Sequence, residues 1–113
     1  MGGRLQGKVA IVTGGGSGFG LAIAEKFAEE GAKVLITDVV PGNAPKVAAA
    51  NPSIKFLKAD VSSRADWEKA LETSLKEFGR LDIVVNNAGI LIVKVPPHKR
   101  EGRLTSEVDD GLY

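Results

Sequence analysis

Glycine is concentrated in one short stretch, TGGGSGFG, where five of the eight residues 13–20 are glycine. Glycine loses more conformational freedom on folding than any other residue, so such a cluster needs a physical reason. One reason is a tight structural turn. The other is the close approach of backbone N–H groups to a phosphate, which a side chain would prevent. The stretch is therefore a candidate anion site, and the elements around it decide between the two interpretations.

The spacing of the glycines predicts a separate role for three of them. Gly14 permits a tight turn, Gly18 permits the close approach of a phosphate, and Gly20 permits close packing of a helix against a strand. The pattern is G-x-x-x-G-x-G rather than the commoner G-x-G-x-x-G, because Phe19 occupies the last glycine place of the latter. A glycine-rich loop alone leaves the plain turn open.

The residues on either side of the glycines predict a strand before them and a helix after them. Residues 8–13 are short, apolar and β-rich, as in a strand buried on both faces. Residues 21–30 carry apolar side chains at helical spacing, and Gly31 stands where a helix ends. A helix that begins at this loop presents unpaired N–H groups with positive partial charge, which favours a pyrophosphate.

Asp38 ends the next predicted strand, residues 33–38. At that position a carboxylate can accept both ribose hydroxyls of an adenosine and repel a 2′-phosphate, which favours NAD over NADP. The alternative is an aspartate that starts the turn before Pro41 and Gly42.

Later segments continue the alternation of strands and helices. Ser63 and Asp66 form a predicted capping box for a helix that closes at Gly79. The further expected elements are a short helix over residues 44–50, a sheet-edge strand over residues 54–58 and a fourth strand over residues 81–85. This order predicts an α/β fold with a parallel sheet of about four strands and helices on both faces. We expect one domain over residues 1–93 and a loose tail over residues 94–113.

Composition excludes several classes of protein. The chain has 113 residues, a net charge of +1 and no cysteine. The small charge does not favour nucleic acid or an anionic membrane, and disulfides and thiolate metal sites are excluded. His98 has no companion ligands, so we expect no metal. Without a signal peptide or a membrane-length apolar run, the expected location is the cytoplasm.

Four motifs, taken in order, resemble the short-chain dehydrogenases/reductases. They are GKVAIVTGGGSGFG, the acidic end of the second strand at Asp38, Asp60–Val61 after the third strand, and NNAG after the fourth. The resemblance runs from about Lys8 to Ile90 and implies a Rossmann-type, doubly wound sheet that binds a nicotinamide dinucleotide.

The resemblance carries binding roles onto the matching positions. It assigns the diphosphate to the glycine loop, the adenosine ribose to Asp38 and the adenine amino group to Asp60, with the Val61 backbone alongside. The turn after the fourth strand would stabilise the central sheet and border the second ribose. The residues so implied are Gly14, Ser17, Gly18, Phe19, Gly20, Asp38, Asp60, Val61, Asn86, Asn87, Ala88 and Gly89. Alternatives stay open, since Asp60 also fits a cap before Ser62, and Asn86–Asn87 fits an ordinary Asx turn.

The family's chemistry is a hydride transfer between an alcohol or ketone and the nicotinamide ring. The resemblance implies a tyrosine acid/base, a lysine four residues later, a serine and a helix asparagine. Tyr113 is the one tyrosine, and no lysine follows it at that spacing. We therefore expect no catalytic residues and no turnover by this chain alone. The alternatives are a non-catalytic nucleotide- or partner-binding module and a truncated product without function.

The fourth strand also raises an expectation about stability and partners. With no strand expected beyond it, Ile83, Val84 and Val85 would form an exposed edge. We expect marginal stability, or a second copy or full-length relative that covers this edge.

Overall fold

The computed structural model describes residues 3–16, 18–87 and 91–94. The elements follow in the order β1 (Val9–Thr13), α1 (Gly18–Glu29), β2 (Lys33–Asp38), α2 (Ala44–Ala50), β3 (Ile54–Lys58), α3 (Arg64–Phe78), β4 (Ile83–Asn86) and β5 (Leu91–Lys94). The predicted bounds of β2, α2 and β3 are confirmed. Helix α1 begins three residues earlier than its apolar periodicity indicated, within the glycine stretch itself.

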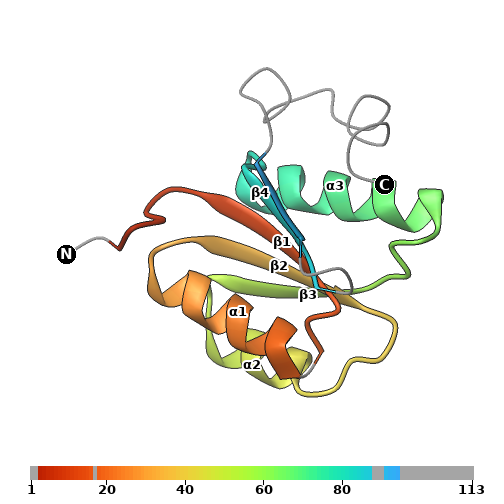
Figure 1. Ribbon diagram of the computed structural model, residues 1–113, viewed down its shortest axis with the longest axis horizontal. Helices are drawn as coiled ribbons and strands as arrows, with labels where there is room; N and C mark the ends of the chain where they lie inside the picture. Colours follow the sequence, from red (N-terminus) through yellow and green to blue (C-terminus); the bar gives the residue numbers. More distant parts are fainter. Residues whose placement is uncertain (1–2, 17, 88–90, 95–113) are drawn as a thin grey trace.

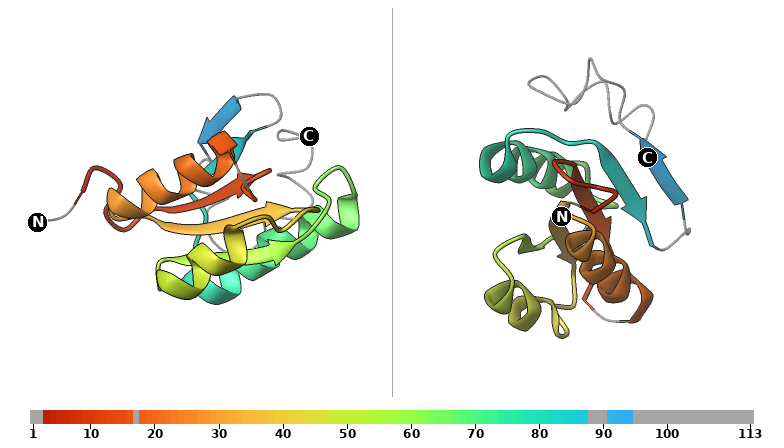
Figure 2. Two further views of the ribbon diagram at one scale, coloured as in Figure 1. Left: turned by 90° about the horizontal axis from the view of Figure 1, so that it is seen from below. Right: turned by 90° about the vertical axis from the view of Figure 1, so that its left-hand side faces the viewer.

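The strands form one sheet in the order β3-β2-β1-β4-β5. The pairs β1–β2, β2–β3 and β1–β4 are parallel, which confirms the predicted parallel sheet of four strands. Helices α1 and α2 cover one face and α3 covers the other, as Figures 1 and 2 show from three directions. From β1 the chain adds β2 and β3 on one side of the sheet and then crosses to add β4 on the other side. Ligands of doubly wound folds bind at the carboxyl ends of the strands at such a switch point.

The expectation that β4 is an exposed edge is wrong. Strand β5 pairs with β4 in antiparallel register, with Asn86 opposite Leu91 and Ile83 opposite Lys94. Ile83, Val84 and Val85 are accordingly buried. Because β5 ends at Lys94, it also crosses the predicted boundary between domain and tail at residue 93.

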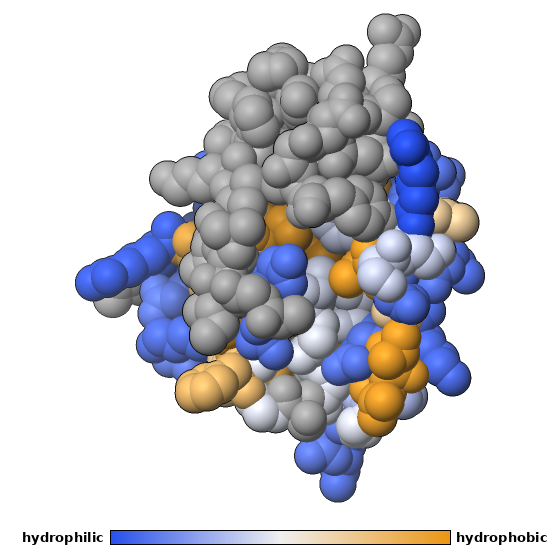
Figure 3. Space-filling model, turned by 45° about the vertical axis from the view of Figure 1, so that its right-hand side comes forward, coloured by the Kyte–Doolittle hydropathy of each residue, from blue (hydrophilic) through white to orange (hydrophobic). Residues whose placement is uncertain are grey.

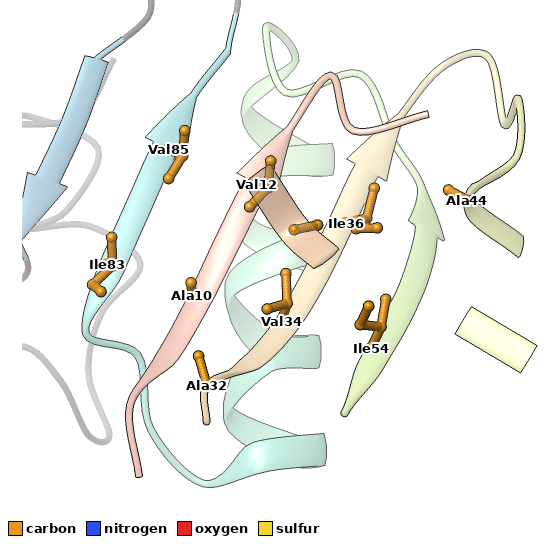
Figure 4. Close-up of a cluster of buried hydrophobic side chains, with 10 residues drawn as sticks. Ala10, Val12, Ala32, Val34, Ile36, Ala44, Ile54, Ile83 and Val85 are labelled. Atoms are coloured by element: carbon orange, nitrogen blue, oxygen red, sulfur yellow. The ribbon is translucent and has the colours of Figure 1, made fainter. Parts of the chain in front are cut away.

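Each face of the sheet has its own apolar cluster because successive side chains of a strand point to opposite sides. Ala10, Val12, Val34 and Ile36 point toward α1 and α2, together with Ile83 and Val85 of β4 (Figure 4). Ile11 and Leu35 point toward α3 and meet Trp67 and Leu71. The core therefore fixes β1 and β2 from both sides and holds their carboxyl ends in place.

Helix α3 begins and ends as its sequence indicates. The Ser63 hydroxyl oxygen accepts the Asp66 N–H at 3.4 Å, and Gly79 closes the helix in the left-handed conformation at φ 84°. The Asp66 carboxylate accepts the backbone N–H of Asp60 at 2.9 Å. The cap thus also ties the helix to the loop after β3.

Candidate functional site: the glycine loop and the strand ends around it

The glycine loop, residues 14–20, joins the carboxyl end of β1 to the start of α1. Gly14 and Gly18 lie at φ 65° and 59°, in the left-handed region that favours glycine. The predicted tight turn at Gly14 is confirmed. A Cβ on Gly20 would collide with the carbonyl oxygen of Gly14 and lie 2.8 Å from Gly15 Cα. Gly20 therefore allows α1 to pack closely against the loop itself. The glycine spacing had predicted this close contact to be with a strand.

The backbone N–H groups of the loop divide into two sets. Gly15 N–H donates to the Thr37 carbonyl at 3.2 Å, and Gly16 N–H donates to Asp38 Oδ2 at 3.0 Å. These two amides are bonded to β2. The first-turn amides of α1, which starts at Gly18, have no partner within the helix. Among the described residues, no atom lies within 4 Å of a Cβ placed on Gly18, and a helix N-terminus is where an anion binds most readily.

Asp38 ends β2 beside the glycine loop. Its Oδ2 accepts the Gly16 N–H, and its Oδ1 accepts the Val40 N–H at 3.1 Å. The second bond is the local turn contact that was the alternative to a ribose role. Each carboxylate oxygen still has a further acceptor position, since an ionised carboxylate offers about four. The turn contact and a ribose contact are thus compatible, and the ribose contact stays a prediction.

The end of β4 lies on the opposite side of β1 from β2. Asn87 Nδ2 donates to the Gly14 carbonyl at 3.1 Å, and the Asn87 N–H donates to Thr13 Oγ1 at 3.3 Å. The Thr13 hydroxyl lies 3.3 Å from the Val85 carbonyl oxygen and 3.5 Å from Asn86 Oδ1, and its single proton can go to either acceptor. Asn87 therefore holds the glycine loop against β4.

The role of Thr13 was missed in the sequence. The signal that could have indicated it is a hydroxyl residue at the end of an otherwise apolar strand, directly before the first glycine. Gly16 was missed as well, because only its contact with Asp38 distinguishes it from its neighbours.

Asp60 lies just past β3, near the end of β2, because the Ala59 N–H donates to the Asp38 carbonyl at 3.1 Å. Its Oδ1 accepts the Ser62 hydroxyl at 2.5 Å and the Ser62 N–H at 3.0 Å. The Ser62 hydroxyl, and then its N–H, lower the pKa of the Asp60 carboxyl below its ordinary value. These are the contacts of the capping alternative, and the adenine contact stays a prediction. The half-buried Val61 packs against the cluster on the α3 side.

The large exposed apolar side chains of the described residues lie in the first turn of α1 and in the loop after β2. Phe19 is 81% exposed, Val39 50% and Val40 65%. Apolar patches also come to the surface among polar residues on the face drawn in Figure 3. Apolar groups beside the N–H donors of a helix N-terminus suit a ligand with flat rings on either side of a phosphate.

Several predicted positions lie outside the described residues. They are Ser17, Ala88, Gly89, His98 and Tyr113. Over residues 3–16, 18–87 and 91–94, no three His, Asp or Glu side chains come together as metal ligands would. No helix in that part of the chain is long and apolar enough to cross a membrane.

Comparison with known proteins assigns the family. The sequence model described as "short chain dehydrogenase" matches residues 8–108. The chain belongs to the short-chain dehydrogenase family. It is 51% identical over 94 residues to an NADP-dependent (R)-specific alcohol dehydrogenase of Lentilactobacillus kefiri, covering 80% of this chain and 37% of that protein. It is also 43% identical over 102 residues to a 3-beta-hydroxysteroid dehydrogenase of Comamonas testosteroni, covering 89% and 39%.

A solved structure agrees with the fold. The 3-ketoacyl-(acyl-carrier-protein) reductase of Brucella melitensis, solved in complex with NADH, superposes with a TM-score of 0.68 at 44% identity. The match covers 72% of this chain and 34% of that one. The chain thus spans 37–39% of the length of the two short-chain dehydrogenase relatives described above. One of the similar proteins is NADP-dependent by name, and another was solved with NADH.

Proposed function

We propose that the glycine loop and the strand ends around it hold the adenosine diphosphate part of a nicotinamide dinucleotide, with NAD favoured over NADP. The observation that carries the proposal is the division of the loop's N–H groups. Those of Gly15 and Gly16 are bonded to β2, whereas the first-turn amides of α1 have no acceptor within the helix, and no atom of the described residues lies within 4 Å of a Cβ placed on Gly18. Membership of the family and the NADH in the Brucella melitensis reductase support a dinucleotide as the anion.

The preference for NAD rests on Asp38. A 2′-phosphate beside this carboxylate would place two negative groups together at the end of β2, whereas ribose hydroxyls can donate to it. The NADP dependence of the Lentilactobacillus kefiri relative makes the preference a real question for this chain.

Calorimetric titration of the chain with NADH and with NADPH tests both parts of the proposal. We expect NADH to bind about tenfold more tightly or better, which corresponds to about 1.4 kcal/mol. Glu25→Ala, an exposed change on α1, is the matched control and should bind both cofactors as the wild type does. Absent binding would contradict the dinucleotide site, and equal binding would contradict the role of Asp38.

For the whole protein, over the length of its relatives, we propose hydride transfer between an alcohol or ketone and the nicotinamide. The bound cofactor supplies the hydride chemistry, and the residues described here hold and orient it. The 113 residues contain no Tyr-x-x-x-Lys sequence. We therefore propose that this chain alone binds the cofactor without turnover, as a nucleotide-binding module. Oxidation of a panel of alcohols by the purified chain, followed as NADH absorbance, would contradict this.

A further inference from the structure

The glycine loop and the loop after β2 form one packed unit. The Gly16 carbonyl accepts the Asn43 N–H at 2.9 Å. A Cβ on Gly16 would collide with the Val40 carbonyl oxygen and lie 3.0 Å from that of Pro41. A Cβ on Gly42 would in turn collide with the Gly16 carbonyl oxygen. The position of one loop therefore depends on the position of the other.

The Asp38 carboxylate bridges these two loops. Oδ2 accepts the N–H of Gly16 at 3.0 Å, and Oδ1 accepts the N–H of Val40 at 3.1 Å. Hydrogen bonds to a charged acceptor are roughly twice as strong as neutral ones.

We propose that Asp38 is a positioning residue that fixes the glycine loop before a cofactor binds, in addition to any contact with ribose. Gly16 stands two residues before the start of α1, so the carboxylate sets where the helix amides lie. The inference uses the proposed function only for the identity of the ligand. The bridge that the Asp38 carboxylate makes between Gly16 and Val40, called the latch below, is a feature of the chain itself.

The two roles of Asp38 act on different ligands. A ribose contact affects only ligands that contain the adenosine ribose. A latch affects every ligand whose phosphate binds at the glycine loop, including one without adenosine. Replacement of Asp38 should therefore weaken binding of reduced nicotinamide mononucleotide, which carries a phosphate but no adenosine.

Amide hydrogen exchange in the ligand-free chain tests the latch directly. In Asp38→Ala, the Gly16 amide should exchange about tenfold faster or more, because its acceptor is lost. The Asp82 amide, bonded to the Val9 carbonyl at 2.9 Å at the other end of the sheet, should keep its rate and thus report an intact fold. Asp38→Asn should restore part of the protection, since its amide oxygen can replace one acceptor. Equal Gly16 exchange in the wild type and Asp38→Ala would overturn the proposal.

Binding of reduced nicotinamide mononucleotide, measured by its fluorescence, gives the second test. Asp38→Ala should weaken it about threefold to tenfold, with Asp38→Asn in between and Glu25→Ala unchanged. Unchanged affinity in Asp38→Ala would overturn a role for the latch in ligand binding. If the wild type binds neither this ligand nor NADH, the proposed function fails, while the exchange experiment still decides whether the latch exists.

Discussion

The two ends of the sheet both place aspartates at strand ends, yet they use them differently. At the amino end, Asp82 is 2% exposed, and its carboxylate accepts the Val9 N–H at 2.9 Å and Arg80 Nε and Nη2 at 2.9 and 2.7 Å. At the carboxyl end, Asp38 is half-buried and Asp60 exposed, and both accept N–H groups of adjoining loops. One end encloses its charge, and the other leaves it partly open to solvent.

The difference shows that a buried ion pair and a binding site place opposite demands on the same residue type. A buried carboxylate is tolerated only when its oxygens are paired, as the fork of Arg80 and the Val9 amide pair those of Asp82. A ligand site needs acceptors and donors that the chain leaves available. The amino end should therefore determine stability, and the carboxyl end should determine binding.

Among the predicted changes, removal of the buried Asp82 carboxylate should have the largest effect on the free energy of unfolding. Asp82→Ala leaves the Val9 N–H and the Arg80 guanidinium without this acceptor, which should cost about 3 kcal/mol of unfolding free energy. Urea unfolding measures it. The remaining folded protein should bind NADH as the wild type does. A loss below about 1 kcal/mol would show that the pair contributes little net stability.

A side chain added within the glycine loop should be the next largest change. Gly20→Ala forces a Cβ against the backbone of Gly14 and Gly15, which should weaken NADH binding about tenfold or more through displacement of α1. Calorimetry measures the loss. The matched control is Gly79→Ala at the end of α3, where φ is 84° and no atom of the described residues lies within 4 Å of an added Cβ. It should cost about 1 kcal/mol of stability and leave binding unchanged, and equal binding loss in both variants would contradict the local effect.

Loss of the contact between β4 and the glycine loop should have a moderate effect. Asn87→Ala removes the bond from Nδ2 to the Gly14 carbonyl, worth about 1 kcal/mol, and should weaken NADH binding about threefold to tenfold. Asn51→Ala is the control, because Asn51 Oδ1 accepts the Ser53 N–H at the amino end of β3. It should lower the midpoint of thermal unfolding without changing affinity. If both variants bind equally well, Asn87 does not position the loop.

The smallest effect concerns the protonation of Asp60. Ser62→Ala removes the hydroxyl that chiefly lowers the pKa of the Asp60 carboxyl, so that pKa should rise toward its ordinary value. Because the folded-state pKa is depressed, the contact stabilises the fold above the ordinary pKa and is lost as pH falls through the lowered one. An NMR titration of the carboxyl carbon measures the change. Ser53→Ala, at the other end of β3, should leave it unaltered.

Much of the fold could be predicted because its elements carry local signals. The apolar runs before Thr13 and Asp38 read as buried strands, and Ser63 and Gly79 bound α3 as their types indicate. Strand β5 could not be assigned in the same way. Residues 91–94 form a strand through antiparallel pairing with β4, and a short apolar run does not specify its partner.

The α/β fold, the glycine loop and the order of the strand-end motifs follow from the sequence alone, because periodicity, turn residues and spacing are local properties of the chain. The structure was needed to show that the Gly15 and Gly16 amides donate to β2, that Asp38 bridges two loops and that β4 lies inside the sheet. The physical reason is that hydrogen-bond satisfaction depends on which groups meet in space. Residues 16 and 38 are separated by 22 positions in the chain and by 3.0 Å between donor and acceptor in the fold.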